Sequence, residues 1–107
     1  MESNVRGHKF AITFVTLAEL DLGFLKARNP LLALRTGMEV LRDVKVLNGS
    51  GKTPSLYAEI YFDLEQRGKM IPVNDIWIAA LALETGLPLL ARDEHFSRVR
   101  DLSVIEC

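Results

Sequence analysis

Segments that favour β-strands alternate with segments that favour helices, and this alternation restricts the fold more than any other feature of the chain. Residues 10–16, FAITFVT, are apolar and rich in β-branched side chains, which is typical of a buried strand. Three further short apolar segments follow at residues 44–48, 87–91 and 103–106, with helical patterns between them. Strands that alternate with helices favour parallel pairing, with helices on both faces of the sheet. The sequence therefore predicts one α/β domain over residues 1–107, a three-layer α/β/α fold with a mainly parallel sheet.

Capping residues mark the first two helices. Thr16 and Glu19 have the spacing of a capping box, in which a hydroxyl residue precedes a glutamate by three positions. A helix is therefore expected from Thr16 to about Arg28. Asn29-Pro30 then provides a cap and a first-position proline for a second helix.

Two more helices follow in the second half of the chain. Thr53-Pro54 opens the third, which should end at Gly68, and the fourth is predicted over residues 75–85, ending at Gly86. The fourth is apolar on almost every side, which predicts deep burial. Trp77 lies among its apolar residues, so we expect it to pack in the core rather than to stack on a base.

Charge and composition exclude several classes of protein. The net charge of −1 argues against binding nucleic acids through overall charge, so any contact with RNA must be local. Cys107 is the single cysteine, which rules out an internal disulfide. The first ten residues lack the apolar core of a signal peptide, and no apolar run approaches the roughly 20 residues that cross a bilayer. We expect a cytoplasmic protein without a membrane contact.

Three acidic residues follow or begin the predicted elements at positions where ligands bind. Ligands of open parallel sheets lie outside the carboxyl ends of the strands. Glu19 and Asp93 follow two of the strands, and Asp75 opens the fourth helix. Each acid alone could simply cap a helix or favour its N-terminus. Capping does not explain why all three should lie at one edge of the sheet.

Three neighbouring carboxylates repel one another unless a cation neutralises them. Oxygen ligands favour Mg²⁺ or Mn²⁺, and His8, His95 and Cys107 lack the ligand spacing of a zinc site. Such an ion would lower the pKa of a bound water and stabilise charge on a phosphoryl oxygen. The acids therefore predict a site for phosphodiester hydrolysis.

Two other motifs have weaker interpretations. Gly51-Lys52-Thr53 follows a strand and precedes a helix, as in a phosphate-binding P-loop, but Val46 occupies the position of the first glycine, so that interpretation fails. His95 is close to Asp93 in sequence, and a lone histidine on a helical turn is more often a surface or packing residue.

Three blocks of sequence, taken in order, resemble the PIN-domain family, and in particular its VapC-type toxins from bacterial toxin–antitoxin pairs. The blocks are residues 14–20 (FVTLAEL), 74–80 (NDIWIAA) and 89–96 (LLARDEHF). The resemblance implies a Mg²⁺- or Mn²⁺-dependent endoribonuclease, usually a homodimer, that a cognate antitoxin inhibits. Carried over residue by residue, Glu19, Asp75 and Asp93 would be its metal-site acids.

One part of the family pattern has no counterpart in this sequence. Family members begin with a strand that ends in aspartate and leads into a helix, whereas here the second block of the pattern comes almost at once. Residues 2–5 echo the first block, but no apolar strand precedes them, and we treat the echo as coincidence. A central strand–helix unit of roughly 20–30 residues is therefore expected to be absent. Its loss would expose the facing edges of the strands at residues 10–16 and 87–91, or make them pair, and would weaken or abolish nuclease activity.

Two other functions stay open at this point. A shortened PIN-like chain could bind an antitoxin or a homologous subunit without cutting RNA. Its helical stretch from Glu19 to Leu41 offers apolar contact area through Leu22, Phe24, Leu25, Leu31 and Leu34, although core packing explains those residues equally well. A general phosphate or nucleotide binder ranks last, because no glycine-rich loop has the required form.

Overall fold

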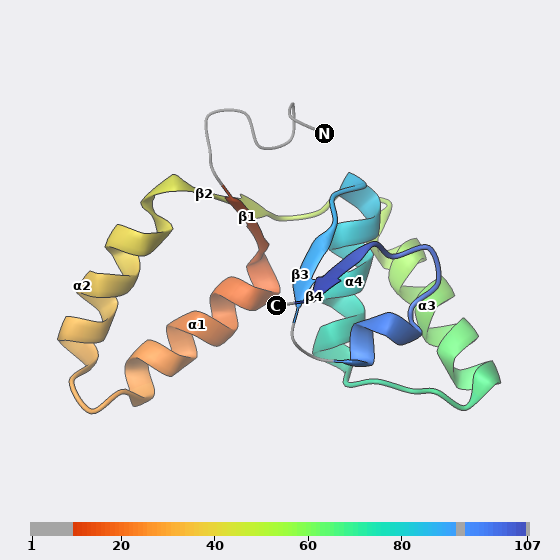
Figure 1. The fold of residues 1–107 in the computed structure, drawn as a ribbon, viewed down its shortest axis with the longest axis horizontal. Coiled ribbons are helices and arrows are strands. Elements are labelled where there is room, and N and C mark those ends of the chain that lie inside the picture. The colour runs from red at the N-terminus through yellow and green to blue at the C-terminus, as the bar shows by residue number, and fades with distance from the viewer. Residues whose placement is uncertain (1–9, 92–93, 107) are drawn as a thin grey trace. The chain divides into compact units, whose positions relative to one another are not determined.

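The computed structural model describes residues 10–91 and 94–106, which form two compact units that divide between Asn48 and Gly49 (Figure 1). We call them the N-terminal unit and the C-terminal unit. The N-terminal unit consists of β1 (Phe10–Thr13), α1 (Phe14–Lys26), α2 (Pro30–Val40), the short 3₁₀ helix η2 (Leu41–Asp43) and β2 (Val44–Leu47). The C-terminal unit consists of α3 (Thr53–Arg67), α4 (Val73–Thr85), β3 (Leu89–Ala91), the 3₁₀ helix η3 (Glu94–Arg98) and β4 (Val104–Glu106).

The strands pair in parallel, as the alternation of elements predicts. β1 pairs with β2 from Phe10 opposite Val44 to Thr13 opposite Leu47. β3 pairs with β4 from Leu89 opposite Val104. Among the described strands each has one hydrogen-bonded neighbour, so every unit contains a two-stranded parallel sheet.

α1 begins earlier than the capping-box pattern predicts. The strand stops at Thr13, whose hydroxyl accepts a hydrogen bond from the backbone N–H of Thr16 at 3.0 Å and so caps the helix. The prediction of a strand through Thr16 with Thr16 as the cap was wrong, and Glu19 belongs to the second turn of α1. Thr13 lies opposite Leu47, the last residue of β2, and the residues after it have no partner strand at this edge.

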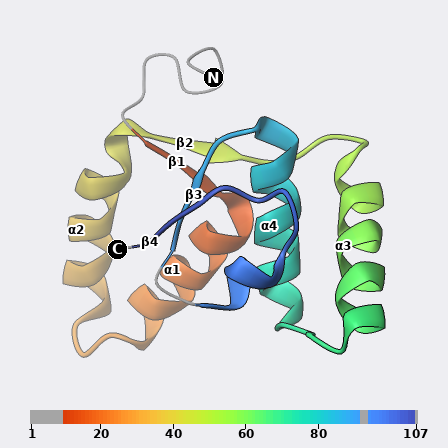
Figure 2. The same cartoon turned by 45° about the vertical axis from the view of Figure 1, so that its right-hand side comes forward.

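α1 and α2 form a helical hairpin in the N-terminal unit (Figure 2). The cap of α2 is the predicted one: Asn29 accepts a hydrogen bond from the backbone N–H of Leu32 at 3.2 Å, and Pro30 follows as the first helical residue. The ring of Phe24 on α1 lies directly over Gly37 on α2, and a Cβ built on Gly37 would lie 2.3 Å from Cζ of that ring. Gly37 therefore permits the close contact between the two helices.

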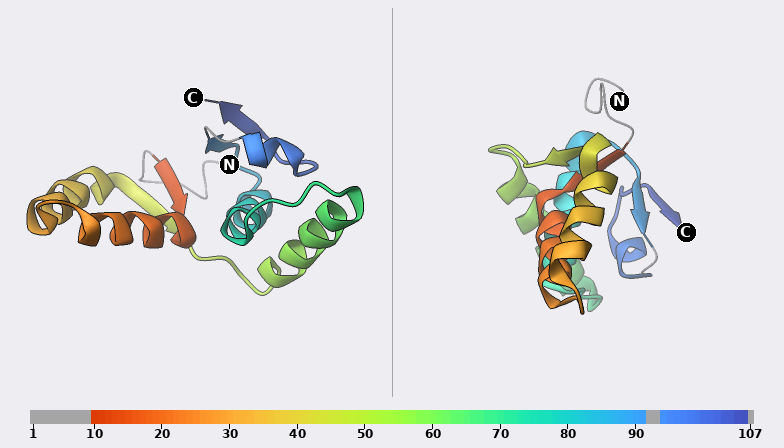
Figure 3. Two further views of the ribbon diagram at one scale, coloured as in Figure 1. Left: turned by 90° about the horizontal axis from the view of Figure 1, so that it is seen from below. Right: turned by 90° about the vertical axis from the view of Figure 1, so that its left-hand side faces the viewer.

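The C-terminal unit has its core between α3 and α4, which run side by side (Figure 3). The three largest fully buried side chains are Leu64, Ile76 and Leu81, one from α3 and two from α4. The predicted burial of the fourth helix is confirmed, although it begins at Val73 rather than at residue 75. Trp77 stacks on Tyr57 of α3 with ring centroids 3.9 Å apart, so it packs against α3 as expected, although it is half-buried rather than part of the core.

The start of α3 also shows why the Gly51-Lys52-Thr53 sequence is not a phosphate-binding loop. Thr53 is buried, accepts a hydrogen bond from the backbone N–H of Ser50 at 2.9 Å and donates one to Glu84 of α4. Its hydroxyl is thus used in holding α3 against α4. None of the helices in the described residues has the length and hydrophobicity that a bilayer crossing requires.

Candidate functional site

Asp75 occupies the first turn of α4. It is the third residue of the helix, and its backbone N–H donates to the carbonyl oxygen of Pro72 at 3.0 Å. Its side chain is 19% exposed, so the carboxylate is largely shielded but still reachable from solvent. The N-terminal end of a helix interacts favourably with a negative side chain at this position.

His95 contacts this carboxylate from η3, twenty positions further along the chain. Its Nδ1 lies 3.1 Å from Oδ2 of Asp75, within hydrogen-bond distance. The His95 side chain is 31% exposed, which places the pair at the surface edge of the core. Sequence reasoning missed this residue, and the signal that could have found it is its position in the third block of the family pattern, two residues after Asp93.

Buried neighbours fix the position of η3. Phe96 and Val99 are 7% and 5% exposed, so the segment is anchored in the core on both sides of Ser97. Two arginine contacts add to this: Arg98 donates to the carbonyl oxygen of Met70 at 3.0 Å, and Arg67 of α3 donates to the carbonyl oxygen of Arg98 at 2.6 Å. The His95 ring is therefore presented to Asp75 by a well-anchored segment.

The other two predicted acids are placed differently. Glu19 lies on α1 in the N-terminal unit, where its side chain is exposed. Asp93 lies outside the described residues. The structure thus brings Asp75 and His95 together and assigns Glu19 to the other compact unit, and the convergence of Glu19, Asp75 and Asp93 remains a prediction.

The donor chemistry of Asp75 fits a hard divalent cation. A carboxylate can coordinate Mg²⁺ or Mn²⁺ through one oxygen while the other accepts a hydrogen bond from a neighbouring side chain. Over residues 10–91 and 94–106, no three His, Cys, Asp or Glu side chains gather closely enough to hold a metal ion. A complete site would therefore need acids beyond the Asp75–His95 pair.

A second charged cluster lies at the end of α3. Arg67 Nε donates to Asp63 Oδ2 at 2.9 Å, and Arg100 Nε lies 3.6 Å from Asp63 Oδ1. The hydrogen bond from Arg67 lowers the pKa of Asp63 below its usual range, the charges of Arg100 and Arg67 add to this, and burial opposes it. The arginines therefore make this cluster an ion-pair network that joins α3 to the segment after η3, and it needs no cation.

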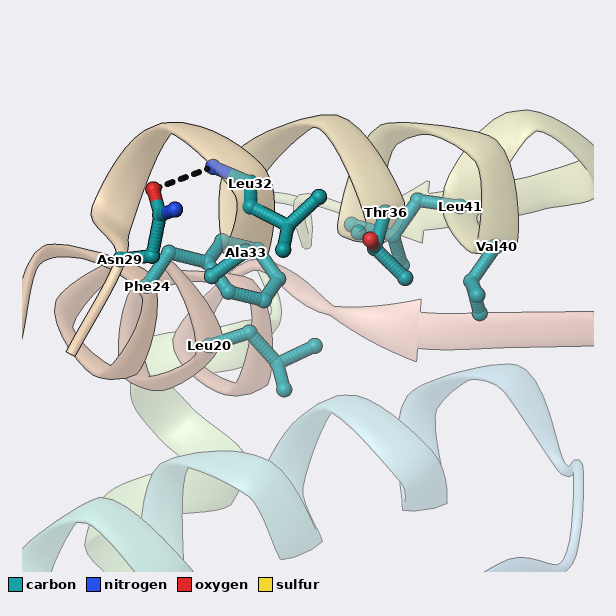
Figure 4. Close-up of a pocket in the computed structure, with 9 residues that line it drawn as sticks. Leu20, Phe24, Asn29, Leu32, Ala33, Thr36, Val40 and Leu41 are labelled. Atoms are coloured by element: carbon teal, nitrogen blue, oxygen red, sulfur yellow. Dashed lines mark hydrogen bonds between the residues drawn. The ribbon is translucent and has the colours of Figure 1, made fainter. Parts of the chain in front are cut away.

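The N-terminal unit carries an apolar groove between α1 and α2 (Figure 4). It encloses about 580 Å³ and is lined on one side by Leu20 and Phe24 of α1 and on the other by residues of α2 that include Leu32 and Val40. Further apolar side chains on the same helices are exposed: Leu22, Leu25, Leu31, Leu34 and Met38. Core packing within the unit therefore does not account for most of this apolar surface.

Comparison with known proteins relates the chain to one family. The sequence model of the PIN domain matches residues 2–102. Ribonuclease VapC5 of Mycobacterium tuberculosis is 31% identical over 100 residues, covering 92% of this chain and 74% of the relative. Ribonuclease VapC4 of the same organism is 30% identical over 101 residues, covering 92% and 78%.

A solved structure has the same fold. The crystal structure of VapBC2 from Rickettsia felis, bound to a DNA fragment from its promoter, contains a chain that superposes with a TM-score of 0.86. That chain is 27% identical, and the match covers 98% of this chain and 80% of the other. The predicted PIN-like α/β fold is thereby confirmed.

Proposed function

Because this chain belongs to the PIN-domain family, we propose that it is an endoribonuclease of the VapC type that depends on Mg²⁺ or Mn²⁺. Support comes from the relatives, which are named ribonucleases and are similar over nearly the whole of this chain. RNA would be the substrate and its phosphodiester bonds the site of hydrolysis. The family also leads us to propose a cytoplasmic homodimer, whose mass light scattering can determine.

Asp75 is the residue on which this proposal depends most. Its carboxylate is held in the first turn of α4 with a largely shielded side chain, in the NDIWIAA block that the family shares. We propose that Asp75, Asp93 and Glu19 hold the cation through their oxygens. When bound, the cation would supply Lewis-acid chemistry to water and to the phosphoryl group. Asp75 would hold such an ion from the first turn of α4, where a negative side chain interacts favourably with the helix dipole.

The test is metal binding and RNA cleavage measured on the same variants. The wild-type chain should bind Mn²⁺ in a titration, and Asp75→Ala and Asp93→Asn should each lose that binding. Metal-dependent cleavage of RNA should fall by a factor of 100 or more in the same variants, since removal of a charged group at a metal site costs several kcal/mol of transition-state stabilisation.

A matched control removes an acid away from this site. Asp101→Asn replaces an exposed aspartate that has a φ of +64°, a conformation that asparagine also adopts. This variant should leave Mn²⁺ binding and RNA cleavage unchanged. Cleavage that persists in Asp75→Ala, or in the presence of EDTA, would contradict the proposal. A wild-type chain without Mn²⁺ affinity would favour a binding module over an enzyme.

A second function, binding to an antitoxin protein, is favoured by the apolar surface of α1 and α2. Leu25 and Leu31 are 73% and 67% exposed, and several other large apolar side chains of the same two helices are exposed as well, which is typical of an interaction surface. The related structure from Rickettsia felis is that of VapBC2 bound to a DNA fragment. We therefore propose that an antitoxin segment covers this surface.

Charge substitutions on this surface test the second function. Leu25→Glu together with Leu31→Glu should weaken co-purification with the cognate antitoxin at least tenfold, because both glutamates would be buried in the complex. Arg42→Glu is the control, because its exposed side chain belongs to η2, outside the surface of α1 and α2, and pairs with Glu39. Unchanged co-purification of the leucine variant would exclude this surface as the contact.

A further inference from the structure

The contact between His95 and Asp75 assigns a role to a histidine outside the predicted set of acids. We propose that His95 is a positioning residue, whose imidazole fixes the rotamer of the Asp75 carboxylate for cation binding. The inference rests on the proposed function of Asp75 as a metal ligand. Its basis is the 3.1 Å separation between His95 Nδ1 and Asp75 Oδ2.

Geometry explains why a histidine at this place orients its partner. An aspartate in the first turn of a helix has two competing arrangements, because its short side chain can also turn back toward the N–H groups of that turn. His95 draws Oδ2 toward η3 instead, and so selects one arrangement. Oδ1 of Asp75 is then left to coordinate a cation. Carboxylates at other metal sites are oriented in the same way by hydrogen bonds to neighbouring residues.

Anchoring of η3 makes the constraint effective. The ring is carried by a segment whose neighbours Phe96 and Val99 are buried, and whose Arg98 is bonded both to Met70 before α4 and to Arg67 of α3. A hydrogen bond from a side chain on a mobile segment costs conformational entropy when it forms. This cost is smaller here, because η3 already holds the backbone of His95 in place. His95 therefore acts on Asp75 through preorganisation.

The alternative role is purely structural, in which the contact only joins η3 to α4. The two roles differ in what they predict for the affinity of Mn²⁺. If His95 positions Asp75, the affinity for Mn²⁺ should depend on an N–H donor at the Nδ1 position. If the contact is only structural, its loss should change the stability of the chain and leave the affinity unchanged.

The experiment measures Mn²⁺ affinity, from the paramagnetic resonance signal of free Mn²⁺, together with the midpoint of thermal unfolding. His95→Ala should weaken Mn²⁺ binding by about 10- to 100-fold, the usual effect of removing a group that orients a metal ligand. His95→Asn should restore affinity to within about threefold of wild type, because the asparagine amide places an N–H donor near the position of Nδ1. His95→Gln places its amide further out, near Nε2, and should not restore it.

Ser97→Ala provides the matched control in the same segment. The Ser97 hydroxyl donates to the Glu94 carbonyl oxygen at 2.6 Å, so its loss should lower the unfolding midpoint without changing Mn²⁺ affinity. A His95→Ala variant with wild-type affinity and a lowered midpoint would overturn the positioning role and leave the proposed function intact. If His95→Ala does not fold, equal affinities in His95→Asn and His95→Gln would overturn it instead. A wild-type chain that binds no Mn²⁺ would overturn the proposed function as well.

Discussion

Single residues at the end of α3 show how one ion pair joins distant segments. Arg67 bonds both to Asp63, one turn before it on α3, and to the carbonyl oxygen of Arg98, the last residue of η3. Both side chains of the pair are partly exposed, so solvent screens their attraction. The hydrogen bond from Arg67 nevertheless lowers the pKa of Asp63, which links this pair to the pH dependence of folding.

Replacing Arg67 with methionine should destabilise the chain more at pH 7 than at pH 3. The pKa of Asp63 is lower in the folded chain than in the unfolded one, so the stabilisation is present above the ordinary aspartate pKa of about 3.9 and is lost as the pH falls through the lower folded value. Urea unfolding of wild type and Arg67→Met at both pH values measures the difference. If the free energies of unfolding of the two proteins differ equally at pH 3 and pH 7, the effect comes from the lost bond with Arg98 instead.

The candidate site could be predicted from the sequence only in part. Asp75 was placed correctly near the start of a buried helix, because an apolar helix that opens with an acid is visible in the sequence. His95 was not recognised, since its contact with Asp75 joins residues twenty positions apart on different elements. Helical periodicity connects positions three or four apart and carries no information on such contacts.

Among the elements, the helix starts marked by proline and the helix ends marked by glycine were predicted correctly. α3 and α4 end at Gly68 and Gly86, whose φ angles of +64° and +74° are the left-handed conformation in which glycine terminates helices. The cap of α1 is Thr13, three residues before the predicted cap, because β2 ends at Leu47 and no other described strand pairs with residues 14–16. The length of the partner strand cannot be predicted from the hydrophobic pattern of residues 10–16.

A single substitution distinguishes the observed cap of α1 from the predicted one. Thr13→Val keeps the shape of a buried side chain but removes the hydroxyl that accepts from Thr16, and should lower the free energy of unfolding by about 1 kcal/mol. Glu19→Ala, measured in EDTA, should change it by less than about 0.5 kcal/mol, since Glu19 is exposed and lies beyond the first turn. A larger loss of stability from Glu19→Ala than from Thr13→Val in chemical denaturation would instead support the predicted capping box of Thr16 and Glu19.

On the scale of the whole molecule, the described core is concentrated in the C-terminal unit. Most of the buried apolar side chains belong to α3, α4 and the segment around η3, whereas Val15 is the buried apolar residue of the described N-terminal elements. The alternation of elements was sufficient to predict parallel pairing. It was not sufficient to predict two sheets of two strands, because short apolar strands have nearly interchangeable patterns and pairing depends on tertiary packing.

Leu81 tests how much the α3–α4 core contributes. Its side chain is 1% exposed, so Leu81→Ala should lower the free energy of unfolding by about 2–5 kcal/mol through lost burial and the cavity that remains. Val73→Ala, on the exposed first turn of the same helix, should change it by about 0.5 kcal/mol or less. Urea denaturation followed by circular dichroism measures both, and similar effects of the two substitutions would contradict a core centred on α4.

The parallel β1–β2 pair is completed by residues 10–47, and this has a consequence for synthesis on the ribosome. Translation at about 5–20 residues per second then needs roughly 2–7 s to add residues 49–81. The N-terminal unit has all of its own strand pairing available during that interval, with the leucines of α1 and α2 exposed to solvent. A chaperone or a binding partner therefore has access to those leucines before the core around Leu81 exists.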